Sequence, residues 1–184
     1  MQRRRFVLLC LAVIILFSSV TAQEKPISKK VIKIGGDYSF PPYVFNDEKD
    51  IPKGYYVELT QAIAEVMGFD VEFRLGKWAK VSEWLDRGEI DVVQGMSYTK
   101  DSGKKYEFSM PIAETWRTYF VRKDSQFKDI SELKQAHIAI QEGDIANDYL
   151  KQIGFEGTKF YTPNQEEALA LLASGKFDAA IVNL

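Results

Sequence analysis

A nine-residue motif occurs twice in this chain. Residues 85–93 read LDRGEIDVV and residues 172–180 read LASGKFDAA, so a leucine, a glycine, an apolar residue and an aspartate recur at one spacing. In each copy an apolar helical pattern ends at a glycine and a short apolar segment follows, which is typical of a helix that leads into a buried strand. The chain is therefore expected to hold two similar α/β units in tandem.

Strand and helix patterns alternate around both copies of the motif. Strands are expected at residues 31–35, 71–75, 90–93, 137–141, 158–162 and 177–182. Helical faces are expected between them, formed by Tyr55, Leu59, Ala62, Ile63 and Val66, by Val81, Trp84 and Leu85, and by two later segments that begin near Asp144 and Asn164. This order predicts parallel sheets with right-handed crossovers. The fold class is thus α/β, with two lobes that each hold a mostly parallel sheet flanked by helices.

Four segments make up the expected domain organisation. Residues 1–22 form a signal peptide or anchor, residues 23–113 lobe I, residues 114–121 a hinge connection and residues 122–184 lobe II. The chain stops at Leu184, directly after an apolar strand that nothing covers, and an uncovered strand invites aggregation. We therefore expect lobe II to be truncated and a C-terminal part of the fold to be missing.

The N-terminal segment predicts export. Three arginines precede an uncharged apolar run at residues 6–17, and small residues follow at 20–22, as in a secretory signal peptide. The whole uncharged run, residues 6–23, is close to the lower limit of a membrane span, so an uncleaved anchor is the alternative. Removal of residues 1–22 would change the net charge from −2 to −5, which disfavours nucleic acid as a partner. The only cysteine, Cys10, would be lost with this segment.

Catalytic patterns are sparse, and we expect neither enzymatic activity nor a cofactor nor a metal. His137 is the only histidine and lies in an expected strand, so a zinc site or a Ser-His-Asp triad lacks partners. Ser102 and Lys105 have the spacing of the serine–lysine pair in penicillin-recognising enzymes, but the companion motifs of those enzymes are absent.

Polar and aromatic residues near expected strand ends indicate a binding cleft instead. Phe40, Tyr43, Trp78 and Trp116 lie in loops or at element ends, and hydroxyl side chains follow Gly95. Ligands of open α/β sheets bind at the carboxyl ends of strands, and clefts between lobes are favoured sites. The sequence thus predicts a cleft with aromatic walls and a polar floor.

The order of several motifs resembles the family 3 extracellular solute-binding proteins. These motifs are Asp37…Phe40-Pro-Pro-Tyr43, Gly54-Tyr55-Tyr-Val-Glu58, Trp78, Gly88-x-x-Asp91, Met96-Ser-x-Thr99, Phe108-Ser-x-Pro111 and Gln141-x-Gly143. The resemblance covers about residues 30–184 and implies a periplasmic, Venus-flytrap fold that closes on a small polar solute by hinge motion. It also implies that the missing C-terminal part would return to lobe I.

The resemblance implies a set of ligand-binding residues. Phe40 would stack on the ligand and Trp78 would lie across from it, Gly95 and Ser97 would contribute backbone and hydroxyl contacts, and Gly143 with Asp144 would present a helix N-terminus to an anionic group. The full set is Asp37, Phe40, Tyr43, Trp78, Gly95, Met96, Ser97, Thr99, Ser102, Gly143, Asp144, Ile145 and Asn183.

Two of these positions depart from the amino-acid binders that the sequence resembles. Those binders place an arginine for the ligand carboxylate where this chain has Ser102, and an acid for the ligand ammonium where it has Asn183. Asp144 adds a like charge beside the expected carboxylate position. We therefore expect a neutral or cationic small molecule rather than a standard α-amino acid.

Two roles within the family are open, and a membrane protein is the expected partner in both. The segments that begin at Phe120 and Gln141 resemble sensor-attached members, which favours the sensory input module of a membrane receptor, with a signalling domain as partner. The alternative is the binding component of an ABC transporter, whose partner is a permease. A dehydratase or a peptidoglycan-acting enzyme on the same fold is the third alternative, and the dehydratase would need Asp144 or Glu58 as its acid or base.

Overall fold

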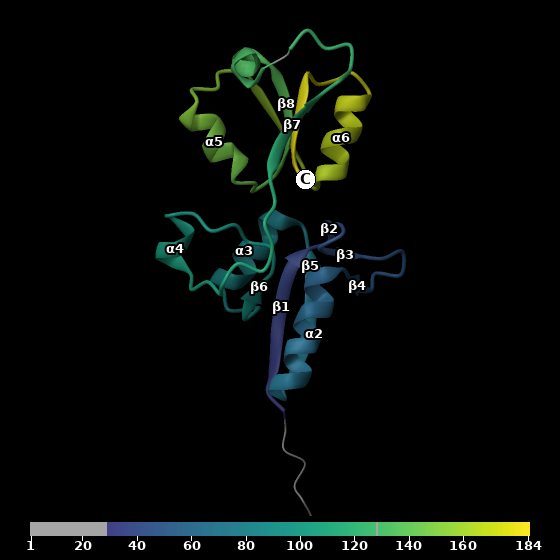
Figure 1. The fold of residues 1–184 in the computed structure, drawn as a ribbon, viewed down its shortest axis with the longest axis vertical. Coiled ribbons are helices and arrows are strands. Elements are labelled where there is room, and N and C mark those ends of the chain that lie inside the picture. Colours follow the sequence, from purple (N-terminus) through teal and green to yellow (C-terminus); the bar gives the residue numbers. More distant parts are fainter. Residues whose placement is uncertain (1–28, 128) are drawn as a thin grey trace, which may run out of the picture.

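The computed structural model describes residues 29–127 and 129–184, which form two α/β lobes joined by extended chain (Figure 1). The signal peptide expected at residues 1–22 lies outside the described residues. Within the described ranges no helix has the length and apolar character needed to cross a membrane. The two-lobed α/β architecture predicted from the sequence is confirmed.

The first lobe is built on a parallel three-stranded sheet of order β5-β1-β6. Its elements are β1 (Val31–Asp37), β2 (Ser39–Phe40), β3 (Val44–Asn46), β4 (Pro52–Lys53), α2 (Tyr55–Met67), β5 (Asp70–Gly76), α3 (Trp78–Asp86), β6 (Val92–Val93) and α4 (Ser102–Lys105). Strands β2, β3 and β4 form a small antiparallel sheet beside it. Gly35 in the central strand lets Ile90 and Val81 approach, since a Cβ there would lie 2.3 Å from Ile90 Cδ1.

Helix α2 buries a different face from the one that its apolar spacing predicts. Its buried residues are Tyr56, Val57 and Ala64, whereas Ile63 and Val66 of the expected face are 46% and 85% exposed. Tyr56 and Val57 pack with the hairpin residue Val44 and with residues of β5. The hairpin thus fixes the rotation of the helix, and periodicity within the helix did not reveal this partner.

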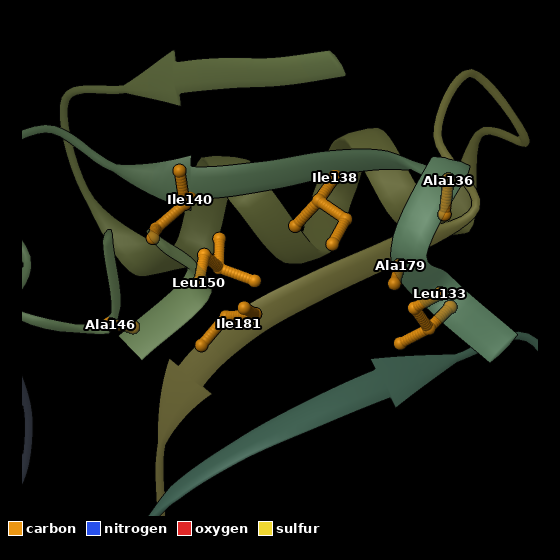
Figure 2. Close-up of a cluster of buried hydrophobic side chains, with 8 residues drawn as sticks. All are labelled: Leu133, Ala136, Ile138, Ile140, Ala146, Leu150, Ala179 and Ile181. Carbon is orange, nitrogen blue, oxygen red and sulfur yellow. The ribbon is translucent and has the colours of Figure 1, made fainter. Parts of the chain in front are cut away.

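The second lobe is built on a four-stranded sheet of order β7-β10-β8-β9. Its elements are β7 (Arg117–Val121), the 3₁₀ helix η1 (Ile130–Gln135), β8 (His137–Gln141), α5 (Ala146–Gln152), β9 (Thr158–Thr162), α6 (Gln165–Ala173) and β10 (Ala179–Asn183). Figure 2 shows the core on one face of this sheet, where Ile138, Ile140 and Ile181 meet Leu150 of α5 and Leu133 of η1. Most of the segment read as a hinge connection, residues 114–121, is β7, which pairs antiparallel with β10.

The repeated motif has the same structural role in both lobes. In each, the central strand (β1 or β8) pairs in parallel with the strand that follows the first helix and with the strand that begins at the end of the motif. The motif aspartate holds that arrangement: Asp91 Oδ2 accepts the Lys33 amide at 2.8 Å, and Asp178 Oδ2 accepts the His137 amide at 2.8 Å. The amide of each aspartate donates in turn to the carbonyl of the same central-strand residue. We call these two arrangements the aspartate clasps.

Candidate ligand-binding site

A polar pocket lies where the carboxyl ends of the two central strands meet between the lobes. Its lining residues are Asp37, Phe40, Val44, Trp78, Gln94, Gly95, Arg117, Gln141, Asp144, Gln165 and Asn183. The cavity volume is about 20 Å³, room for roughly one water molecule. The lobes contact each other around this small cavity, so the described arrangement is a closed one.

Direct hydrogen bonds hold the two lobes together across the pocket. Gln141, the last residue of β8, donates its side-chain amide to Asp37 Oδ2 at the end of β1. Next to this contact, Asn164 Nδ2 donates to Tyr38 Oη at 2.8 Å. Both contacts join residues far apart in the sequence, so the closed arrangement has its own polar interface.

Asp37 is the most strongly desolvated acid for which a pKa change is resolved. Its carboxylate accepts the Ser39 amide at 2.8 Å and the Gln141 amide, and both bonds favour the ionised form. Burial nevertheless dominates and raises the pKa of Asp37 above the ordinary value of 3.8. The pocket therefore contains a carboxyl group whose pKa is raised by its burial.

Arg117 and Asp144 form an ion pair inside the pocket. Arg117 Nε donates to Asp144 Oδ1 at 2.7 Å, with the Asp144 side chain 5% exposed and that of Arg117 24% exposed. Arg117 Nη1 also donates to Ser97 Oγ at 3.3 Å, which ties the guanidinium to the other lobe. The pair places one positive and one negative charge side by side, so together they leave the pocket without added net charge.

Two buried oxygen acceptors of the pocket lack a hydrogen-bond partner among the described residues. They are Gln94 Oε1 and Asn183 Oδ1. The orientation of the Gln94 amide is fixed, because its nitrogen donates to the Tyr56 carbonyl and to the Thr60 hydroxyl. Unpartnered buried acceptors are costly unless a donor reaches them. The pocket is therefore suited to a ligand that donates hydrogen bonds.

The structure brings six of the thirteen residues expected from the sequence into the pocket lining. These are Asp37, Phe40, Trp78, Gly95, Asp144 and Asn183. Tyr43 lies behind the lining instead, where its ring stacks on Phe40 at 5.0 Å between centroids and contacts Tyr56. Phe40 is thus positioned by a second aromatic ring.

In the loop that follows Gly95, the hydroxyl groups of Thr99 and Ser102 form hydrogen bonds within the loop. Ser102 Oγ accepts the Thr99 amide at 2.8 Å and contacts the Ser97 carbonyl, so it shapes the loop and does not line the pocket. Met96 and Thr99 do not line it either, and Ser97 is linked to it through Arg117.

The start of α5 differs from the open helix N-terminus that the resemblance implies. Asp144 Oδ1 itself accepts the Ala146 amide at 2.7 Å, so the first amide that could bind an anion is occupied. Gly143 lies at the lobe interface, where a Cβ would meet Ala79 Cα at 3.3 Å and Trp78 Cδ1 at 3.4 Å. Neither Gly143 nor Ile145 lines the pocket.

Five lining residues were missed from the sequence: Val44, Gln94, Arg117, Gln141 and Gln165. Gln141 belongs to one of the family motifs, but the motif alone does not indicate its role. Arg117 lies in the segment expected to be a hinge connection, so no binding role was predicted for it. The signal that could have indicated one is an arginine at the start of a half-apolar segment beside the expected cleft. Among the described residues, no group of three or more His, Cys, Asp or Glu side chains could hold a metal.

The fold and this inter-lobe pocket are those of a two-lobed periplasmic-binding protein. Residues 32–142 match the family model of the bacterial extracellular solute-binding proteins, family 3, and the chain belongs to this family. The resemblance predicted from the motifs is confirmed.

Curated relatives and solved structures give the same classification. The chain is 28% identical over 107 residues to a probable histidine-binding protein of Neisseria gonorrhoeae, covering 58% of this chain and 40% of that protein. It is 26% identical over 157 residues to the arginine-binding extracellular protein ArtP of Bacillus subtilis, covering 84% of this chain and 61% of that protein. The chain thus spans about half the length of these curated relatives.

Among solved structures, a histidine kinase sensor domain with similarity to periplasmic binding proteins is 38% identical, with a TM-score of 0.81, covering 85% of this chain and 69% of that one. An ancestral arginine-binding protein bound to arginine is 28% identical, with a TM-score of 0.77, covering 85% and 71%. An ancestral amino acid-binding protein described as a precursor of cyclohexadienyl dehydratase is 27% identical, with a TM-score of 0.76, covering 83% and 70%.

Proposed function

We propose that this chain binds a small polar solute between its two lobes and closes on it by hinge motion. The observation that carries the proposal is the polar pocket at the carboxyl ends of both central strands, with the unpartnered acceptors Gln94 Oε1 and Asn183 Oδ1. A solute that donates hydrogen bonds to these oxygens would stabilise the closed form, because it removes the penalty of leaving them unpaired.

The binding surface that we propose combines the expected residues with those that line the pocket. Phe40 and Trp78 are the aromatic walls, and Asp37, Gln94, Gly95 and Asn183 are the polar contacts. Tyr43 supports Phe40, while Met96, Ser97, Thr99 and Ser102 shape the loop beside the pocket, as Gly143 and Ile145 do on the opposite lobe. We propose residues 23–113 as lobe I and residues 122–184 as lobe II, after an export signal at 1–22. Of the segment 114–121, residues 117–121 belong to the sheet of lobe II as β7, so the proposed hinge is reduced to residues 114–116.

The role that we favour is the sensory input module of a membrane signalling receptor in the periplasm. The similarity to a histidine kinase sensor domain, at 38% identity, supports this role. The alternative is the binding component of an ABC transporter, which the relative named as a probable ABC transporter extracellular-binding protein of Bacillus subtilis favours. A dehydratase is the less favoured third candidate, and the similarity to a dehydratase precursor is the observation behind it.

Solute binding can be tested by calorimetry on a panel of small polar molecules, using a matched pair of variants. Asn183 and Asn46 both carry a buried, unpartnered Oδ1, but only Asn183 lines the pocket. We expect Asn183→Ala to weaken binding of the selected solute at least tenfold and Asn46→Ala to leave it unchanged. Equal affinities in both variants would place the solute elsewhere.

The role is tested by the coding sequence after codon 184: a membrane span with signalling motifs supports the sensor, and neighbouring permease genes support transport.

A further inference from the structure

The Arg117–Asp144 pair fills a cation site with a side chain of the protein itself. Asp144 is nearly fully buried, and the guanidinium of Arg117 lies 2.7 Å from Oδ1. Buried carboxylates are stable when a paired cation and hydrogen bonds compensate for lost hydration. Asp144 has both, since the Ala146 amide also donates to Oδ1 at 2.7 Å. The second lobe thus presents a fixed carboxylate that a cationic group is required to neutralise.

The position of Arg117 is set from three sides. Its backbone lies in β7, in register with Asn183 of β10. Its Nε is held by Asp144, and its Nη1 is held by Ser97 of the first lobe. A guanidinium fixed in this way is part of the pocket wall and not a freely moving side chain.

The charges around Arg117 argue against the simplest alternative, that it binds the carboxylate of an anionic solute. Asp144 already neutralises the guanidinium, and Asp37 also lines the pocket. An anion would therefore meet two carboxyl groups and one guanidinium that is already engaged. The buried pocket oxygens that lack partners, Gln94 Oε1 and Asn183 Oδ1, are acceptors, which an anion does not satisfy.

We propose that Arg117 determines specificity by occupying, from within the chain, the place where a cationic group of a solute would bind Asp144. A solute then reaches only the other part of the pocket, formed by Asp37, Gln94 and Asn183. The class selected is a neutral or singly cationic hydrogen-bond donor, and a solute with a second cationic group or a net negative charge is rejected. This selection rests on the proposed solute binding, whereas the latent cation site at Asp144 does not.

The latent site predicts that a small guanidinium compound binds when the Arg117 side chain is removed. The test compares methylguanidinium binding to the wild-type chain and to Arg117→Ala, by calorimetry and by the shift in melting temperature. We expect methylguanidinium to bind Arg117→Ala at least tenfold more tightly than the wild type. Adding Asp144→Asn to Arg117→Ala should abolish the gain. Arg122→Ala is the matched control, because Arg122 binds the carbonyls of Leu172 and Phe177 outside the pocket.

Equal binding of methylguanidinium to the wild type and to Arg117→Ala would overturn the proposal, as would a gain that survives Asp144→Asn. If Arg117→Ala does not fold, Arg117→Thr suits strand β7 better and also leaves the guanidinium site empty, so the same tenfold gain is expected from it. The solute panel applied to the wild type is independent of this result. If no solute of the panel binds but methylguanidinium binds Arg117→Ala as expected, the proposed function is wrong and the cation site stands. If a solute binds but methylguanidinium shows no gain, the proposed function stands and the cation site is wrong.

Discussion

Among single residues, Asp37 links burial in the cleft to the pH dependence of stability. Because burial raises its pKa, the folded chain holds this proton more tightly than the unfolded chain does. The stabilising contribution of the protonated group is thus present below its ordinary value of 3.8 and is lost as pH rises through the folded-state pKa.

The variant Asp37→Asn removes this titration while an amide oxygen remains to accept a hydrogen bond. We expect its melting temperature, relative to wild type, to increase between pH 4 and pH 7, because only the wild type has to ionise a buried carboxyl. Melting curves of both proteins across this range measure the difference. A wild type that gains on the variant as pH rises would contradict the assigned pKa direction.

Gly143 offers a second test at this scale, because it has a positive φ of 81° and also lies against the other lobe. Gly154 has a φ of 67° with nothing within 4 Å of a Cβ, so it is a matched control. Alanine should destabilise either site by about 1 kcal/mol through backbone strain. Only Gly143→Ala should also weaken solute binding, since its Cβ presses on Ala79. Melting temperature and calorimetry separate the two effects.

Single residues also mark the limit of what sequence could predict about the site. The sequence pattern places Ser102 where the related binders have an arginine, but a guanidinium reaches the pocket from Arg117 in β7. Whether a side chain at a strand end faces the pocket depends on sheet register, and the pairing of Arg117 with Asn183 is not visible in either segment alone. Gln94 was missed for the same reason.

Elements were more predictable where the pattern is local. The expected strands at 137–141 and 158–162 have the observed bounds of β8 and β9, and Asn164 caps α6 by accepting the Glu167 amide. The predicted buried face of α2 was wrong, because the face that this helix buries is set by its tertiary contact with the hairpin β3–β4. The strand expected at 90–93 is shorter, with only Val92–Val93 in β6.

The aspartate clasps give a prediction for the elements that they join. Removing the Asp91 carboxylate leaves the Lys33 amide of β1 without its side-chain acceptor, and removing the Asp178 carboxylate does the same to the His137 amide of β8. We expect Asp91→Ala and Asp178→Ala each to destabilise the chain by about 1 kcal/mol, and the corresponding asparagine variants to lose less, because an amide oxygen still accepts. Urea denaturation measures both pairs. A loss in only one lobe would show that the clasps are not equivalent.

At the scale of the whole molecule, the balance between open and closed forms depends on a few polar contacts. Tyr38→Phe removes the acceptor of the inter-lobe bond from Asn164, whereas Tyr161→Phe removes a bond to Asn147 within one lobe. A net hydrogen bond of about 1 kcal/mol corresponds to roughly a fivefold shift in an equilibrium. We expect small-angle scattering to show a larger radius of gyration for Tyr38→Phe only. An increase in both would rule out the hinge explanation.

The central strands place corresponding positions of the repeat face to face. Counting four residues from the clasped amide leads to Asp37 in β1 and to Gln141 in β8, and these two side chains bond across the cleft. The pocket therefore lies where equivalent ends of the two central strands meet, with a carboxylate on one side facing an amide on the other. A solute between them would take part of its orientation from this difference, so exchanging Asp37 and Gln141 should reverse that part of the polarity of the site.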